Sequence, residues 1–147
     1  MTLDLLFGRL HPLFVHFPIA LIILASVVEV ARIKWDHPTL GTFVVFLLAA
    51  GAVGSLAASA TGWIFANDYY PAPSEQWMLG RHRWLGVSTT VLAGTAVAVA
   101  NRWASATTRK TLWLRRGVIW ITALAVTITA HLGALMVWGT DYFMIRN

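Results

Sequence analysis

The stretch LHPLFVHFPIALIILASVVEV, residues 10–30, decides the fold of this 147-residue chain. After Pro18 it is almost entirely apolar as far as Val28. About 20 such residues in a helix cross the hydrocarbon core of a bilayer. The stretch therefore predicts a membrane-spanning helix, which begins with two histidines and two prolines where apolar residues are usual.

The rest of the chain has the composition of a membrane protein. It is 58% hydrophobic and 12% charged, whereas soluble domains carry about 25% charged residues. It contains no cysteine, which excludes disulfides, cysteine-ligated clusters and covalent haem attachment. We expect an all-α, four-helix transmembrane bundle forming a single domain (residues 1–147), with no cleaved signal peptide and no internal repeat. The expected spans are residues 12–31, 41–66, 84–100 and 117–138.

Lysine and arginine are distributed unevenly between the two sides of this bundle. The first and third loops carry Arg32, Lys34, Arg102, Arg109, Lys110, Arg115 and Arg116. The opposite side carries Arg9, Arg81, Arg83 and Arg146. The positive-inside rule then predicts that both termini face outward from a bacterial inner membrane. We attribute the net charge of +5 to lysines and arginines that fix the orientation of the spans, and we expect no nucleic-acid partner.

Four of the five histidines fall in the outer half of the predicted bundle. They are His11, His16, His82 and His131, whereas His37 lies in a loop on the other side. A rise of 1.5 Å per residue makes His16 and His131 the deeper pair. Polar side chains within membrane helices usually face a partner inside the bundle. We therefore expect a metal or haem site with the deep pair, His16 and His131, as axial ligands. The shallow pair, His11 and His82, would bind a second haem or contact the first site from outside its ligands. Isolated interfacial histidines are the alternative.

Several cofactors suit histidine nitrogen without a thiolate. Haem b, as one or two groups, is the favoured cofactor, and copper or zinc is the alternative. Glycines beside the histidines leave room for a flat ring, namely Gly62, Gly86 and Gly133. Arginines beside the histidines could bind propionates, namely Arg9, Arg81 and Arg83. Plain helix packing could equally account for the glycines, and contact with lipid head groups for the arginines.

Three motifs resemble a bacterial membrane family known as domain of unknown function 2231. They are the opening LHPLFVHFPIAL, a central HRWLG and a late HLGALMVWG, and together they extend over nearly the whole chain. Ala134 departs from the family pattern, which often has a second glycine there. The resemblance implies a small redox module related to b-type cytochromes. We expect an electron-transfer protein rather than a stand-alone enzyme, with the bilayer, quinol and a periplasmic redox protein as partners. Oligomerisation stays open, and a cofactor-free accessory subunit is the third alternative.

Overall fold

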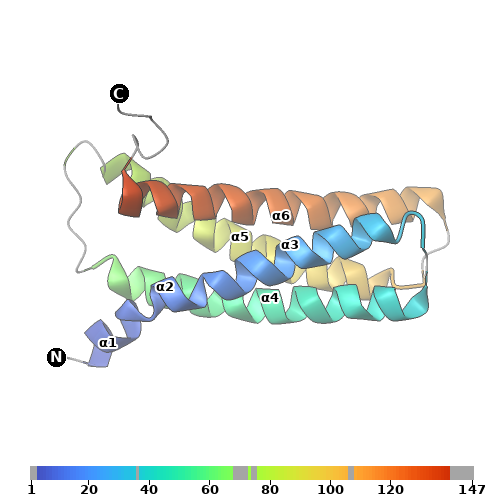
Figure 1. The fold of residues 1–147 in the computed structure, drawn as a ribbon, viewed down its shortest axis with the longest axis horizontal. Helices are drawn as coiled ribbons and strands as arrows, with labels where there is room; N and C mark the ends of the chain where they lie inside the picture. The colour runs from blue at the N-terminus through green and yellow to red at the C-terminus, as the bar shows by residue number, and fades with distance from the viewer. Residues whose placement is uncertain (1–2, 36, 68–72, 74–75, 106–107, 140–147) are drawn as a thin grey trace.

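The computed structural model describes residues 3–35, 37–67, 73, 76–105 and 108–139, and these form an all-helical bundle (Figure 1). The helices are α1 (Leu3–Arg9), α2 (His11–Phe14), α3 (His16–Ala31), α4 (Pro38–Phe65), α5 (Gln76–Arg102) and α6 (Arg109–Trp138). Four candidate membrane spans result, at Leu6–Ala31, Pro38–Phe65, Gln76–Arg102 and Arg109–Trp138. The predicted fold class, a bundle of four transmembrane helices, is confirmed.

The last two spans begin about eight residues earlier than their apolar runs suggested. The added turns start at Gln76 and Arg109 and carry polar side chains with long aliphatic stems. Such side chains lie along apolar surface while their charged ends reach the interface, so the helix continues beyond the apolar window. The assignment of residues 1–147 to one domain stays a prediction.

The first span is broken into three short helices by its prolines. Helix α2 carries Pro12 at its start, and α3 carries Pro18 in its first turn. Proline has no backbone N–H and its ring crowds the carbonyl four residues earlier, which breaks or kinks a helix. The next bond, from the Ile19 N–H to the Val15 carbonyl, is long at 3.4 Å. The helical hydrogen bonding is therefore interrupted between the segment holding His11 and the rest of the first span.

Two helical hairpins repeat the same packing, with an offset of 71 residues (from His11 to His82). The first hairpin is residues 11–66 and the second is residues 82–137. Buried positions of one correspond to buried positions of the other: Pro18 with Thr89, Ile22 with Ala93, Ala25 with Ala96, Glu29 with Ala100, Val44 with Arg115, Leu48 with Ile119, Gly51 with Thr122 and Ser55 with Val126. This is the pattern of parallel repeats about an axis along the bundle. Few residues at these positions are identical, so the correspondence lies in the packing, and the expectation of no repeat in the sequence stays a prediction.

One end of the bundle, which we call the arginine end, is filled by buried charge. Glu29 on α3 and Arg115 on α6 are both fully buried. The Glu29 carboxylate accepts from Arg32 at 3.0 Å and from Arg115 at 2.7 Å, and Arg116 lies 3.6 Å away. Arg115 also donates to the Trp103 carbonyl. Arginines that the sequence presents as loop charges thus join α3 to α6.

Candidate functional site

A cavity of about 440 Å³ lies at the opposite end, which we call the histidine end. The start of α1 and the end of α6 lie at this end (Figure 1). Residues from α2, α3, α4, α5 and α6 line the cavity, and most of the lining is apolar. One lining residue, Val126, belongs to a small apolar cluster that also contains Ile22 and Ala93. Ligand pockets of proteins typically measure about 300–1,000 Å³, so the cavity is large enough for a small organic ligand.

His11 enters the cavity from α2 and is held by α4. Its Nδ1 lies 2.9 Å from the carbonyl oxygen of Ala58. A Cβ added at Gly62, one turn further along α4, would lie only 2.7 Å from the His11 ring. The absence of a side chain at Gly62 therefore lets this imidazole lie directly against the helix backbone. Phe65 stacks beside it, with ring centres 6.4 Å apart.

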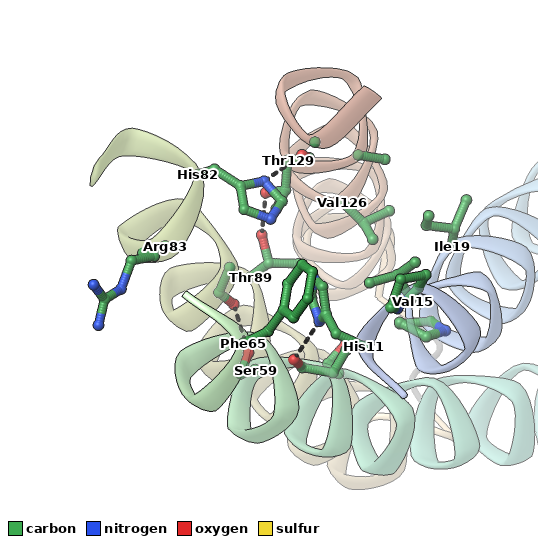
Figure 2. Close-up of a pocket in the computed structure, with 18 of the residues that line it drawn as sticks. His11, Val15, Ile19, Ser59, Phe65, His82, Arg83, Thr89, Val126 and Thr129 are labelled. Atoms are coloured by element: carbon green, nitrogen blue, oxygen red, sulfur yellow. Dashed lines mark hydrogen bonds between the residues drawn. The ribbon is translucent and has the colours of Figure 1, made fainter. Parts of the chain in front are cut away.

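His82 enters from α5 and is held by α6 in the same manner. Its Nδ1 lies 3.0 Å from the carbonyl oxygen of Thr129. A Cβ added at Gly133 would lie 3.0 Å from the His82 ring. Each histidine thus bonds to a carbonyl on the second helix of its own hairpin (Figure 2). Four residues further along that helix, a glycine lies against the ring. The two half-sites are equivalent under the repeat.

The two imidazoles lie close together across the cavity. Their ring centres are 6.1 Å apart and their planes are inclined at 79°. A carbonyl oxygen only accepts hydrogen bonds, so each Nδ1 carries the proton and donates it. In the neutral ring the lone pair is then on Nε2, which is the nitrogen left for a ligand. No hydrogen bond among the described residues engages either Nε2. Donation of the second ring N–H to a carbonyl is the arrangement usual for metal-binding histidines.

Hydroxyl groups join α4 to α5 beside the histidines. The Ser59 and Thr90 hydroxyl oxygens lie 2.8 Å apart. The Gly86 carbonyl lies 3.3 Å from the Ser59 hydroxyl and 3.0 Å from the Thr90 hydroxyl, and the Ser55 carbonyl lies 3.1 Å from the Thr90 hydroxyl. Each hydroxyl has one proton to donate, so these contacts share two protons. These bonds close the wall of the cavity between the two helices (Figure 2).

The remaining histidines occupy different environments. His16 is exposed yet lines the same cavity from the start of α3, whereas His131 is exposed and lies outside the set of described lining residues. His37, at the far end, caps α4 by accepting from the Thr39 N–H. The pairing of His16 with His131 came from depth alone, but the structure instead brings together His11 and His82. Depth ignores the rotation of each helix, which decides which side chains face the cavity.

The predicted arginines and glycines also divide between cavity and surface. Arg83 lines the cavity, and its guanidinium lies 4.0 Å from the centre of the Trp63 ring. Arg9 and Arg81 are exposed and lie outside the lining. Gly86 lines the cavity as Gly62 and Gly133 do, but a Cβ there would meet only ordinary contacts. Gly86 therefore leaves space in the cavity rather than permitting a close approach of helices.

Most of the chain matches a known protein family. The family described as "Predicted membrane protein (DUF2231)" matches residues 9–143. The chain belongs to this family. No curated protein matches the chain, and no solved structure does either. For this DUF2231 protein, membership therefore establishes a membrane protein with four candidate spans, and the chemistry of the site must be argued from its residues.

Sequence reasoning missed the groups that orient the histidines. The Ala58 and Thr129 carbonyls belong to backbone, which no motif marks. The signal that could have found them is the spacing, since each histidine lies 47 residues before its acceptor. Within the described part of the chain, no group of three or more His, Cys, Asp or Glu side chains is placed to hold a metal ion.

Proposed function

We propose that this protein is a small membrane b-type cytochrome that binds one haem between His11 and His82. The observation that carries the proposal is the pairing of two imidazoles at 6.1 Å, each with Nδ1 bonded to a carbonyl. Two histidine nitrogens on opposite sides of one metal, with metal–nitrogen bonds of about 2 Å, place their ring centres about 6 Å apart. The observed spacing therefore fits a pair of axial ligands.

The residues around the two histidines fit the same role. Bound haem supplies reversible one-electron chemistry, with a potential set by its ligands and surroundings. The carbonyls of Ala58 and Thr129 would fix the orientation of His11 and His82 and increase the basicity of each ligating nitrogen. Arg83 lines the cavity, but its guanidinium lies over the Trp63 ring and points away from His82 (Figure 2), so it would have to turn inward to meet the carboxylates of a ligand. The apolar lining excludes water from the ligand pair.

A bare copper or zinc ion is the competing hypothesis. Zinc sites in proteins use three or four protein ligands. His11 and His82 supply two, and His16, which lines the same cavity, would have to supply a third. Two ligands are the number that a six-coordinate haem takes from the protein, so the pair favours haem. The same experiment separates the two.

The proposed place of the protein is the inner membrane of a bacterium, with the histidine end facing outward. The seven lysines and arginines at or near the arginine end, against four on the other side, support this orientation. Quinol and a periplasmic redox protein would then be the electron donor and acceptor. A reporter fused after Asn147 tests the orientation, because activity of a reporter that works only in the cytoplasm would contradict it.

The test of the cytochrome is the optical spectrum and haem content of the purified full chain from a haem-replete host. Wild type should hold about one haem per chain and show a low-spin b-type spectrum. His11→Ala and His82→Ala should each abolish that spectrum. His131→Ala, on a histidine outside the cavity, should leave it unchanged. Folded wild type without haem would overturn the proposal, and metal analysis of the same sample would then test copper and zinc.

A further inference from the structure

The cavity is exposed mainly along one seam between helices. Among its lining residues, five are exposed: Pro12, His16, Trp63, Ala134 and Val137. Four of them lie at the start of the first span or at the end of α6, and Val137 is 75% exposed. Figure 2 shows Val126 of α6 opposite Val15 and Ile19 of the first span, across the cavity. We call this boundary between α3 and α6, at the histidine end, the open seam.

In the repeat, the boundary between α4 and α5 is equivalent to the open seam between α3 and α6. We call this boundary the closed seam, because hydrogen bonds join its two helices. Where the closed seam has the bonded groups of Ser59, Thr90 and Gly86, the open seam has apolar side chains. The counterparts, again 71 positions apart, are Ser59 with Ala130, Thr90 with Ile19 and Gly86 with Val15. Trp63 has Ala134 as its counterpart. The closed seam is thus sealed by hydroxyl groups and an indole, whereas the equivalent positions of the open seam carry small or apolar side chains.

The cause of the opening lies in the broken first span. Its outer part leans on α4, where glycines permit close approach. A Cβ at Gly54 would lie 3.1 Å from Pro18, and one at Gly62 would lie 2.7 Å from His11. Helices α1 and α2 pack against α4. At the other end of the bundle, Glu29 and Arg115 hold α3 against α6. The seam is therefore fastened at the arginine end and spread at the histidine end.

We infer that the haem passes into and out of the cavity sideways from the lipid, through the open seam. This inference rests on the proposed function. The residues of the open seam belong to candidate membrane spans, so in a bilayer the seam would lie against lipid. A largely apolar, flat ring dissolved in the bilayer meets apolar side chains there, and no side-chain hydrogen bond between described residues links Val15 or Ile19 to Ala130 or Ala134. Passage through the closed seam would require breaking the bonds between Ser59 and Thr90 and those to the Gly86 and Ser55 carbonyls.

The repeat itself suggests the variant that should close the seam. Ala134→Trp gives the open seam the indole that Trp63 gives the closed one. The control is Ala60→Trp, at an exposed alanine of α4 that lies outside the cavity lining. Apoprotein made in a haem-deficient host is placed in lipid nanodiscs and mixed with haem-loaded vesicles. The rise of the low-spin absorbance gives the rate of uptake, and the final spectrum gives the ligation.

Ala134→Trp should slow uptake on the order of tenfold, an increase in the barrier of about 1.4 kcal/mol. Ala134→Gly should load faster than wild type, and Ala60→Trp should load at the wild-type rate. Val137→Trp, at the rim, gives a second blocking variant in case Ala134→Trp does not fold.

Uptake at the wild-type rate by a folded blocking variant would overturn lateral passage and leave the cytochrome intact. Wild type that takes up no haem would overturn both proposals.

Discussion

The two hairpins place side chains at equivalent positions but use them differently at the two ends of the bundle. At the histidine end they match, because His11 and Gly62 correspond to His82 and Gly133. At the arginine end they complement each other, since buried Glu29 of the first hairpin pairs with buried Arg115 of the second. A site between two histidine ligands requires the same side chain at the two equivalent positions, whereas a salt bridge requires side chains of opposite charge. The repeated packing supplies the geometry for both, and the side chains at each end decide which is formed.

The largest effect is expected where the hairpins differ most. Glu29→Gln removes the counter-charge of Arg115, which is fully buried, and of the nearly buried Arg32. Breaking a buried ion pair by neutralising one partner typically costs about 3–5 kcal/mol. We therefore expect a loss of stability of this order, measured by thermal unfolding in detergent.

The matched control for Glu29→Gln is Arg109→Gln, at an exposed arginine in the first turn of α6. If Glu29→Gln had the same unfolding temperature as wild type, the arginine end would not be what holds the two hairpins together.

A smaller effect is expected where the hairpins match. In Gly62→Ala the new methyl group would start 2.7 Å from the His11 ring, and in Gly133→Ala it would start 3.0 Å from the His82 ring. Overpacking of this kind costs about 1–3 kcal/mol. Both variants should lose stability and shift or weaken haem binding, with the larger loss in Gly62→Ala. The measurements are the unfolding temperature and the haem content of each variant.

Gly86→Ala is the control for these glycines, because its Cβ meets no atom closer than 3.9 Å. If all three glycine variants behaved alike, the close contact of each ring with its helix would not be what requires glycine.

The sequence predicted the four spans because apolar runs of bilayer length carry that information directly. It also predicted that four histidines share one half of the bundle, since that follows from the direction of each helix. It did not predict which of them meet. Position 131 lies off the buried face of α6 that carries Thr122 and Val126, and that face is set by packing between helices.

The arginines illustrate the same limit. Arg32, Arg115 and Arg116 follow or precede apolar runs, as charges that set topology do. Only the structure shows that Glu29 gathers them inside the bundle. A charge that marks an interface and a charge buried at a helix contact look identical in sequence, because the difference is again one of rotation.

The closed seam offers a weaker test of the difference between hairpins. Thr90→Val keeps the shape of the side chain but removes the hydroxyl that bonds to Ser59 and to the Ser55 carbonyl. Hydrogen bonds between membrane helices average about 0.6 kcal/mol. We expect a loss of about this size in thermal unfolding. Thr95→Val is the control, because the Thr95 hydroxyl bonds only within its own helix, to the Val91 carbonyl; an equal loss in both variants would mean that the bonds across the closed seam add no stability.

The smallest effect is expected at His37, which belongs to neither half-site. It lies at the arginine end of the bundle, ahead of α4, and its exposed side chain accepts from the Thr39 N–H at 3.3 Å. His37→Ala removes one solvent-accessible cap, and the loss of an N-cap side chain costs about 0.5–2 kcal/mol. Because this bond is long and exposed, we expect the lower end of that range, with haem content and spectrum unchanged. His37→Asn, which restores a good capping side chain, should recover the stability without touching the cavity. Loss of haem in His37→Ala, measured beside His11→Ala, would place a ligand at the arginine end and contradict the assignment of the site to the paired half-sites.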